Sequence, residues 1–360
     1  MISGKFWENR KVLVTGHTGF KGAWLCLCLH CLGAKVTGYA LEPPTCPSLF
    51  DLTGVKDMVD SHIADVLDAE KLACVVKDSG SEVIIHMAAQ ALVRDSYKDP
   101  VATYATNVMG TINLLEAVRT CEGVRAVVNV TSDKCYENKE WPWGYRETES
   151  LGGYDPYSSS KACSEIVTAA YRRSFFNHGD HFQHRAGVAS ARAGNVIGGG
   201  DWAADRLIPD CIRAFLKKET VSIRSPEAIR PWQFVLSPLY GYLMLAERLY
   251  RDGSDYAMAW NFGPDSCDEK PAGWVVQKLF EKLQVADGYM FDKGVHPHES
   301  GCLKLDSSLA RLRLGWKPVW DLEKTLDAIV EWTVAYQNGD DIKRVCFNQI
   351  AEFTRSIAEN

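Results

Sequence analysis

Three glycines, each separated by two residues, constrain this chain more than any other feature. Gly16, Gly19 and Gly22 stand between the apolar run Val12–Val14 and a longer apolar stretch that ends at Gly33. The order predicts a buried strand, a glycine turn and a helix. In such a turn the glycines allow a sharp bend, close approach of the backbone to a pyrophosphate, and tight packing of helix on strand. The segment therefore predicts a dinucleotide-binding unit.

The composition is that of an ordinary globular protein and excludes several classes of partner. Of the 360 residues, 46% are hydrophobic and 24% are charged. The net charge of −6 argues against nucleic acid or an anionic membrane as the main partner. The first residues lack the apolar segment of a signal peptide, and no run reaches transmembrane length. We therefore expect the cytoplasm as the location.

Two short patterns raise the possibility of a metal site. Cys28 and Cys31 form C-x-x-C on the helix expected after the glycine turn, and His178, His181 and His184 recur every third residue. Neither pattern is accompanied by a second pair of ligands, whereas a structural zinc ion takes four. We expect no metal: the cysteines pack in the core, and the histidines lie in a solvated loop.

Strand and helix patterns alternate through the first half of the chain. Strands are expected near residues 35–39, 61–66, 82–86 and 125–130, and a helix over 107–120. From about residue 175 the alternation becomes less regular. The predicted fold class is α/β, a doubly wound parallel Rossmann-type sheet with a smaller C-terminal lobe. We assign residues 1–190 to the dinucleotide-binding domain and 191–360 mainly to the substrate lobe, with the chain crossing between them.

The most chemically suggestive residues follow the expected strand 125–130 and open the next helix. Ser132, Asp133 and Lys134 come at the carboxyl end of that strand, where open parallel sheets bind ligands. Tyr157 and Lys161 are four residues apart, so a helix presents them on one face. A lysine cation beside a tyrosine lowers a phenol pKa that is ~10 in water. The pair therefore suggests acid–base chemistry.

These motifs together resemble the extended short-chain dehydrogenase/reductases that act on nucleotide sugars. The resemblance is strongest to the branch of CDP-glucose 4,6-dehydratases and spans roughly residues 5–335. It is carried by TGHTGFKG, EPPTCPSLF, TSDKCYEN, YSSSK, GGGDWAADRLIP and RPWQFV. The resemblance implies a seven-stranded sheet, NAD as cofactor, and a homodimer, possibly a dimer of dimers, built on helices beginning near Asn107 and Tyr157. It also implies a role in deoxysugar and O-antigen precursor synthesis.

The reaction implied is dehydration of CDP-glucose to CDP-4-keto-6-deoxyglucose. Tyr157 would take the proton of the sugar 4-hydroxyl, with Lys161 supporting the phenolate and Ser132 binding the hydroxyl. Asp133 would protonate the departing 6-hydroxyl, and Lys134 would remove the proton at carbon 5. The usual glutamate base of related dehydratases is missing, because Lys134 stands in its place.

Further positions are carried over from the same resemblance. The expected cofactor-binding residues are Gly16, His17, Gly19, Phe20, Lys21, Gly22, Asp65, Val66, Met87, Ala88, Ala89, Thr106, Tyr157 and Lys161. The expected substrate-binding residues are Gln90, Ser132, Asn195, Arg206, Leu207, Arg230 and Asn261.

Two departures from the family pattern bear on the affinity for NAD. No acidic residue stands at Ala40, where many NAD enzymes hold the adenosine ribose. His17 and Lys21 put polar groups into the turn, and we place the Lys21 cation near the adenosine end. We expect NAD to be bound less tightly than in relatives that retain it through turnover.

Three other functions remain open from the residues alone. A nucleotide-sugar 4-epimerase shares the glycine turn, Tyr157 and Lys161, but it needs no acid and base like Asp133 and Lys134. A dehydratase for another nucleoside-diphosphate glucose differs only in the base that it binds. A non-catalytic NAD(P) sensor shares the fold but has no need of the Tyr–Lys pair.

Overall fold

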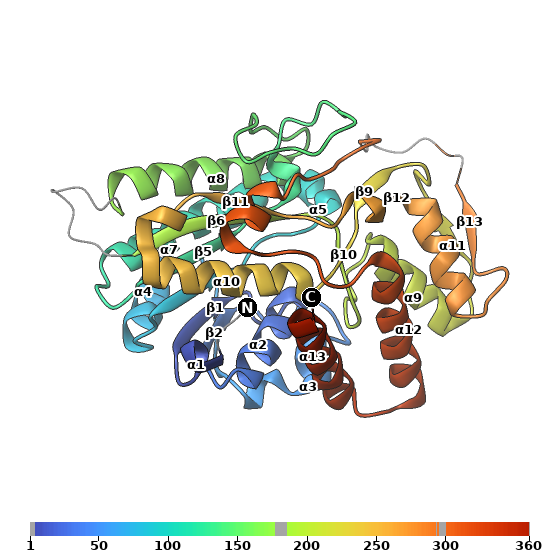
Figure 1. The fold of residues 1–360 in the computed structure, drawn as a ribbon, viewed down its shortest axis with the longest axis horizontal. Helices are drawn as coiled ribbons and strands as arrows, with labels where there is room; N and C mark the ends of the chain where they lie inside the picture. Colours follow the sequence, from blue (N-terminus) through green and yellow to red (C-terminus); the bar gives the residue numbers. More distant parts are fainter. Residues whose placement is uncertain (1–3, 177–185, 293, 295–299, 360) are drawn as a thin grey trace.

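A seven-stranded, all-parallel sheet forms the centre of the protein (Figure 1). The computed structural model describes residues 4–176, 186–292, 294 and 300–359; His178, His181 and His184 lie outside them. In spatial order the strands are β11 (Ala259–Phe262), β6 (Gly187–Ala193), β5 (Ala126–Val130), β4 (Val83–His86), β1 (Lys11–Thr15), β2 (Lys35–Ala40) and β3 (Asp60–Ile63).

α-Helices form a large part of the remaining described chain. They are α1 (Gly4–Trp7), α2 (Phe20–Cys31), α3 (Leu49–Thr53), α4 (Ala69–Asp78), α5 (Val93–Lys98), α6 (Pro100–Tyr104), α7 (Gly110–Arg119), α8 (Pro156–Ser174), α9 (Leu207–Lys217), α10 (Leu236–Asp252), α11 (Ala272–Lys282), α12 (Leu322–Asn338) and α13 (Ile342–Glu359). No helix in the described ranges has the length and apolar character needed to cross a bilayer.

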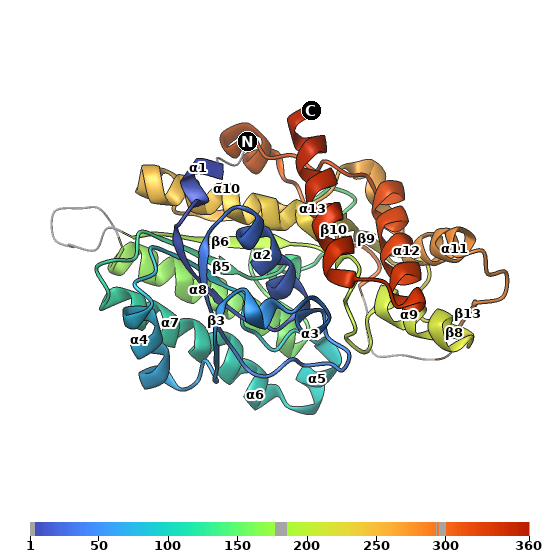
Figure 2. The same cartoon turned by 90° about the horizontal axis from the view of Figure 1, so that it is seen from below.

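Both faces of the sheet are buried beneath helices, as Figure 2 shows. Side chains alternate between the faces of a strand, and in β1 Val12 and Val14 join one apolar cluster while Leu13 joins the other. Helices α2, α10 and α13 pack into the first cluster, and α4, α7 and α8 pack into the second. Because each face needs apolar side chains, the strands read as continuous apolar runs. The predicted doubly wound α/β fold is confirmed.

Two helical segments differ from the sequence-based expectation. The helix expected over 107–120 begins as a π-helical turn, Ala105–Met109, before continuing as α7. Helix α13 was not predicted, although Ile342, Cys346, Ile350 and Phe353 recur at helical spacing and are buried. It packs against α2, α3 and α12, so the end of the chain completes the core on one face of the sheet.

Small sheets and helices gather beyond the carboxyl edge of the large sheet (Figure 1, right). Three two-stranded pairs occur there: β10 (Gln233–Phe234) with β7 (Val196–Ile197), β12 (Glu269–Pro271) with β9 (Ile229–Pro231), and β13 (Tyr289–Phe291) with β8 (Val221–Ile223). Helices α9 and α11 pack on each other beside them. Strand β11 and helix α10 return to the large sheet, so the second half of the chain contributes to both regions.

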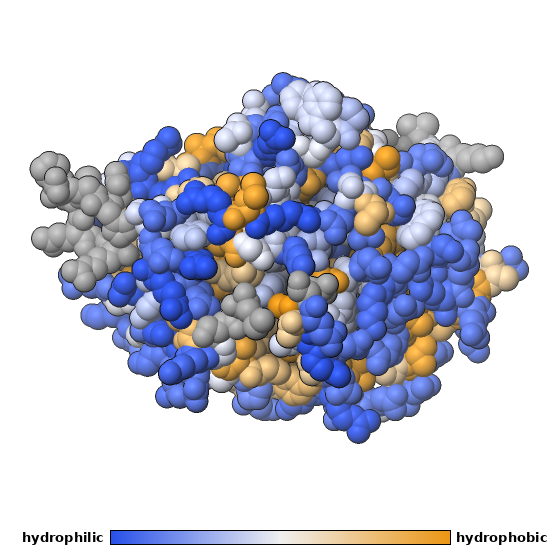
Figure 3. Space-filling view, viewed as in Figure 1, coloured by the Kyte–Doolittle hydropathy of each residue, from blue (hydrophilic) through white to orange (hydrophobic). Residues whose placement is uncertain are grey.

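The face of the molecule in Figure 3 is mainly hydrophilic, with apolar residues in small separate groups. The two larger apolar clusters of the core are separated by the sheet, and a third, smaller cluster includes Cys135, Tyr136 and Tyr145.

The glycine turn joins β1 to α2 with almost no free space. Gly16 has a left-handed backbone, φ +76°, and a Cβ there would lie 2.8 Å from backbone atoms of Met87 and Ala88. A Cβ on Gly22 would lie 2.0 Å from the Gly16 carbonyl oxygen. A Cβ on Gly19, by contrast, would make only an ordinary contact of 3.5 Å with the same oxygen. The first and third glycines are therefore required by packing, whereas the second leaves room above the turn.

This difference predicts opposite results for two alanine substitutions in one turn. Gly22→Ala should lower the free energy of unfolding by about 1–3 kcal/mol, because backbone must move away from the new methyl group. Gly19→Ala should change it by less than about 1 kcal/mol while weakening dinucleotide binding. Urea unfolding followed by tryptophan fluorescence measures both variants against wild type. Equal destabilisation by the two substitutions would contradict the assigned packing roles.

Candidate active site

A large cleft opens at the carboxyl edge of the sheet. It has a volume of about 1680 Å³, with walls from the glycine turn, the ends of β2, β4 and β5, the start of α8, and segments beyond residue 193. Strand order reverses beside β1, because β2 and β4 flank it on opposite sides. Ligands of open α/β sheets bind at this kind of position.

Most residues expected at the site line this cleft. They are Gly16, Gly19, Phe20, Lys21, Gly22, Asp65, Val66, Met87, Ala88, Ala89 and Thr106 from the cofactor set, Ser132, Asp133, Lys134, Tyr157 and Lys161 from the catalytic set, and Gln90, Asn195, Arg206, Leu207 and Arg230 from the substrate set. Two of the expected site residues, His17 and Asn261, do not line the cleft in the described part of the chain.

The glycine turn fits the pyrophosphate of a dinucleotide. Helix α2 begins at Phe20, and its N-cap residue, Gly19, has extended backbone and supplies no side-chain cap. The first N–H groups of the helix are therefore available to an anion, and the helix dipole favours negative charge there. Ala40, Leu41 and Glu42 line the cleft at the end of β2. The cleft wall therefore has an alanine, Ala40, at the position where an acidic residue was expected to be missing.

His17 has a structural environment rather than one facing the cleft. Its side chain is buried, its Nε2 is 2.7 Å from Ser61 Oγ, and its ring meets Phe50 edge to face. The ring fills the space beside Gly38, where a Cβ would lie 2.4 Å from it. Burial lowers the pKa of His17 to about 4, so the imidazole is neutral at pH 7. The side chain therefore supports the turn from behind, and cofactor binding by His17 stays a prediction that its backbone would have to fulfil.

Lys21 points to the reacting end of the cleft, not to the adenosine end. Its Nζ lies 5.8 Å from the ring centroid of Tyr242, which is buried in α10. Burial, together with the nearby charges of Lys161 and Arg206, lowers the pKa of Lys21 to about 7, while the charge of Asp133 opposes this shift. The placement near the adenosine is corrected.

The expected catalytic segment leaves β5 as a short 3₁₀ turn, Asp133–Cys135. Ser132 caps the turn: its Oγ accepts a hydrogen bond from Lys134 N at 3.2 Å and donates one to Asp133 Oδ1 at 3.0 Å. Asp133 is buried, and its Oδ2 finds no hydrogen-bond partner within the described chain. Burial raises the pKa of Asp133, although Lys134, Ser132 and Arg230 oppose the shift. A carboxyl group in this state is suited to donating a proton.

Helix α8 supplies the tyrosine and the lysine. Asp155 caps the helix by accepting hydrogen bonds from Ser158 N at 2.9 Å and Ser158 Oγ at 2.6 Å. Pro156 is in its first turn, as the fixed φ of proline favours. Tyr157 and Lys161 then lie one turn apart on the inner face, both buried at the wall of the cleft.

Burial, rather than the cation of Lys161, dominates the pKa of Tyr157. Burial raises the pKa of Tyr157 to about 12, and a hydrogen bond with Ser132 and the charge of Arg206 only partly oppose it. Lys161 directs its Nζ to the carbonyl of Val130, at 3.3 Å. Burial lowers the pKa of Lys161 to about 8, against the opposing charges of Glu165 and Cys135. Desolvation therefore dominates both groups.

The expected substrate residues divide into a group at the cleft and one outlier. Gln90, Asn195, Leu207 and the two arginines line the cleft, and Arg206 Nη1 also lies 3.1 Å from Asp201 Oδ2. Asn261 is completely buried. Its Oδ1 accepts a hydrogen bond from Tyr136 OH at 2.7 Å, and its Nδ2 donates to the carbonyl of Tyr145 at 2.8 Å. The expected contact of Asn261 with substrate is therefore corrected: this side chain joins β11 to the catalytic segment.

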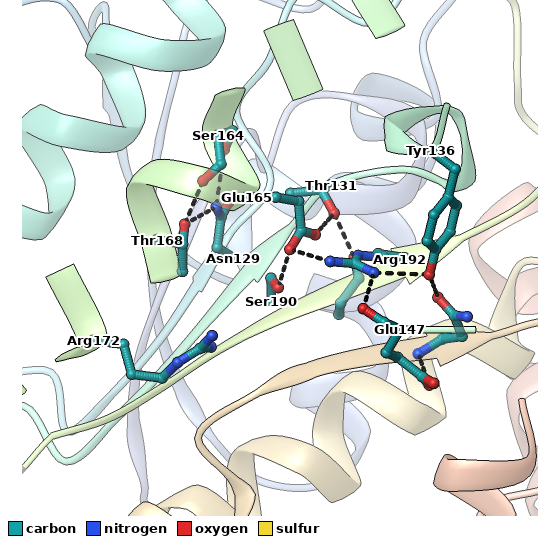
Figure 4. Close-up of polar contacts among 12 residues, drawn as sticks. Asn129, Thr131, Tyr136, Glu147, Ser164, Glu165, Thr168, Arg172, Ser190 and Arg192 are labelled. Atoms are coloured by element: carbon teal, nitrogen blue, oxygen red, sulfur yellow. Dashed lines mark hydrogen bonds and ion pairs between the residues drawn. The ribbon is translucent and has the colours of Figure 1, made fainter. Parts of the chain in front are cut away.

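Two groups of residues at the site were missed from the sequence. At the rim of the cleft, Asp205 lies 3.1 Å from Arg94 and 3.6 Å from Arg224. The ion pair with Arg94 joins α5 to the second half of the chain. Behind the site, Glu165 forms a buried ion pair with Arg192 (Figure 4). The sequence could have pointed to Glu165, because this carboxylate lies one helical turn after Lys161. No local pattern pointed to Arg192, because its partner is distant in the sequence.

Comparisons with known proteins agree with the fold and the motifs. Residues 12–259 match the NAD dependent epimerase/dehydratase family. The chain is 51% identical, over 98% of its length and 98% of the relative's, to CDP-glucose 4,6-dehydratase of Salmonella typhimurium.

Two solved structures share the fold over nearly the whole chain. UDP-glucose-4-epimerase of Stenotrophomonas maltophila, with bound NAD, has a TM-score of 0.79 at 20% identity and covers 92% of this chain and 99% of its own. DesIV, a dTDP-glucose 4,6-dehydratase of Streptomyces venezuelae with NAD bound, has a TM-score of 0.77 at 22% identity and the same coverage. The dinucleotide turn, the Tyr–Lys helix and these matches lead to one conclusion: the chain belongs to the NAD dependent epimerase/dehydratase family, among the extended short-chain dehydrogenase/reductases.

Proposed function

We propose that this protein is a NAD-dependent dehydratase that converts CDP-glucose to CDP-4-keto-6-deoxyglucose with loss of water. The observation that carries the proposal is 51% identity over nearly the full length to a CDP-glucose 4,6-dehydratase. The cleft supports it, because an acid candidate and an amine, Asp133 and Lys134, line the same wall as Tyr157 and Lys161. An epimerase has no use for this second pair.

NAD would lie along the cleft with its pyrophosphate on the glycine turn and the N-terminus of α2. Asp65 and Val66 would border the adenosine, and Met87, Ala88, Ala89 and Thr106 would border the rest of the cofactor. When bound, NAD supplies the reversible hydride chemistry, accepting a hydride from carbon 4 of the sugar and returning it at carbon 6. Its reduced and oxidised forms balance over one turnover, so the net reaction is loss of water.

Tyr157 and Ser132 would act on the sugar 4-hydroxyl. Tyr157, as phenolate, takes the hydroxyl proton, and Ser132 orients the same hydroxyl through its Oγ. The raised pKa of Tyr157, about 12, means that the phenolate has to be stabilised by charge in the occupied cleft. Lys161 and Lys21 are the two buried amines that can supply it, since both lie at this end of the cleft.

Asp133 and Lys134 would carry out the elimination across carbons 5 and 6. Asp133 is suited to protonating the departing 6-hydroxyl, because burial favours its protonated form. Oxidation at carbon 4 makes the proton on carbon 5 acidic, so a moderate base suffices to remove it, and Lys134 is assigned to this role. Both residues line the cleft from the same short turn, so they would act on neighbouring carbon atoms of one sugar.

The second half of the chain, residues 191–360, would mainly bind the nucleotide sugar. Arg206 and Arg230 are assigned to the substrate pyrophosphate, because guanidinium groups suit phosphate oxygens and both line the cleft beyond β6. Gln90, Asn195 and Leu207 would contact the sugar and its diphosphate from neighbouring parts of the wall.

We further propose a cytoplasmic homodimer that serves deoxysugar synthesis for lipopolysaccharide O-antigen. The dimer would form on the segments that begin near Asn107 and Tyr157. Apolar side chains are exposed on or beside these segments: Met109 is 47% exposed and Ile166 55%, and Val101 in the preceding helix α6 is 78% exposed.

Incubation of the purified protein with NAD and CDP-glucose tests the activity against its rivals. We expect a 4-keto-6-deoxy sugar nucleotide, detected by its base-sensitive absorbance and by mass loss of one water. CDP-galactose as product would identify an epimerase, and an unchanged substrate would favour a non-catalytic sensor. Parallel reactions with dTDP-glucose and GDP-mannose determine which nucleotide base the cleft accepts; a preference for either would overturn the assignment to CDP-glucose.

Replacing Tyr157 by phenylalanine should abolish turnover without disturbing the fold. The ring keeps its packing at the start of α8, and only the hydroxyl that exchanges a proton is lost. We expect kcat to fall by about 10²–10⁴-fold, with an unchanged melting temperature and unchanged NAD affinity by calorimetry. A variant that keeps more than about a tenth of the wild-type rate would refute this role, since general acid–base catalysis typically contributes far more.

Replacing Lys134 by methionine should separate oxidation from elimination. With substrate deuterated at carbon 5, wild type should exchange this deuterium with solvent during turnover. In Lys134→Met we expect oxidation at carbon 4 to continue, so that the 4-keto hexose accumulates without losing deuterium or water. Met keeps most of the length and apolar character of the side chain, so binding serves as the internal control. Normal deuterium washout in the variant would show that another group removes the proton.

A further inference from the structure

A buried polar network joins β6 to α8, the helix that also carries Tyr157 and Lys161 (Figure 4). At its centre, Arg192 Nη2 on β6 lies 2.9 Å from Glu165 Oε2 on α8, and only 4% and 3% of these side chains are exposed. The proposed chemistry uses neither residue. Buried ion pairs are often no better for stability than apolar residues of similar size. The position of this pair therefore needs another explanation.

Glu165 joins helix α8 to the start of the catalytic segment. Its Oε1 accepts a hydrogen bond from the Thr131 hydroxyl, and its Oε2 accepts one from Ser190 Oγ at 2.5 Å. Thr131 directly precedes Ser132, and Glu165 lies one helical turn after Lys161. A contact between them therefore links the two elements on which the proposed catalytic side chains stand.

Arg192 holds the other end of the same segment. Its Nη1 donates to Tyr136 OH at 2.8 Å and to the carbonyl of Glu147 at 3.1 Å. The Tyr136 hydroxyl in turn donates to Asn261 Oδ1 at 2.7 Å, on β11. The segment 131–136 is thus anchored at both ends to side chains of α8, β6 and β11, with Ser132 and Asp133 between the anchors.

The charges of the pair agree with a fixed, ionised carboxylate. Burial by itself would raise the pKa of Glu165, but Arg192 and the two hydroxyl donors more than offset this effect, and the pKa is lowered. Glu165 remains charged and also opposes the loss of the Lys161 proton, which burial favours. The carboxylate thus acts on Tyr157–Lys161 through charge and on Ser132–Asp133 through Thr131.

We propose that Glu165 and Arg192 are positioning residues, which hold the segment Thr131–Tyr136 against helix α8 so that Ser132 and Asp133 face Tyr157. This inference rests on the proposed dehydratase function, since it concerns the same reacting groups. The Thr131 hydroxyl transmits the placement of Glu165 to the catalytic segment, because it is the group of that segment that Glu165 contacts directly.

Thr131→Val and Ser190→Ala form a matched pair that tests the proposal without leaving a buried charge unpaired. Each removes one hydroxyl donor to Glu165, but only Thr131 belongs to the catalytic segment. We expect Thr131→Val to lower kcat for CDP-glucose about tenfold, since small misplacements of reacting groups are costly, with KM changed less than about twofold. Ser190→Ala should keep kcat within about twofold of wild type, and Thr131→Ser should restore it.

Two readouts separate positioning from a general loss of stability. Thr131→Val should increase the deuterium isotope effect with substrate deuterated at carbon 4, because misalignment slows that step. It should also accelerate hydrogen–deuterium exchange at residues 131–136, whereas Ser190→Ala should not. Equal effects of the two variants on kcat, or exchange in the segment that matches wild type, would overturn the proposal. If the wild-type protein has no dehydratase activity, the proposed function is refuted instead. The exchange measurement still tests whether the contact between Glu165 and Thr131 holds the segment 131–136 in place.

Discussion

A parallel sheet buried on both faces is the constraint on which the rest of the molecule depends. Both faces of β1 are apolar, so helices have to cover each side, and ligand-binding groups gather at the edge where the strands end. All seven strands point the same way, and their carboxyl ends meet at that edge. The glycine turn, the segment after β5 and the start of α8 are thereby brought to one cleft.

Burial also determines the chemistry that the cleft can support. Desolvation raises the pKa of Asp133, lowers those of Lys161 and Lys21, and raises that of Tyr157. Each shift favours the neutral form, so the Tyr157 phenolate of the proposed mechanism needs a positive charge beside it in order to form. Glu165, with Arg192 and hydroxyl donors around it, is instead held in the charged form. This charged pair takes no part in the proposed proton transfers and supports the groups that do.

The buried pair and the cleft depend on the same connections between distant segments. Arg192 lies in β6, Tyr136 after β5 and Asn261 in β11, and the three meet because these strands are neighbours in the sheet. At the rim, Arg94 and Asp205 join the two halves of the chain in the same way. The same sheet order that places the reacting groups also supplies the contacts that hold them.

Local patterns in the sequence determined the parts of this protein that depend on neighbouring residues. The glycine spacing, the apolar runs of the strands and the Tyr–Lys interval each encode a turn, a face or a helix within a few residues, and the fold and cleft follow them. Helix α13 was equally readable from its apolar spacing but was not predicted. Resemblance, rather than physics, supplied the choice of nucleotide and the individual roles of Asp133 and Lys134.

The tertiary structure alone decided where individual polar side chains point. His17 and Lys21 occupy one turn, yet Gly38 leaves space that buries His17 behind it, and α2 directs Lys21 to the reacting end. Asn261 lies in an apolar strand and was expected at the ligand, but residues more than a hundred positions earlier take up its hydrogen bonds. Arg192 finds its carboxylate on another element altogether. A side chain's partner depends on which elements pack beside it, and this packing is settled only when the whole sheet has formed.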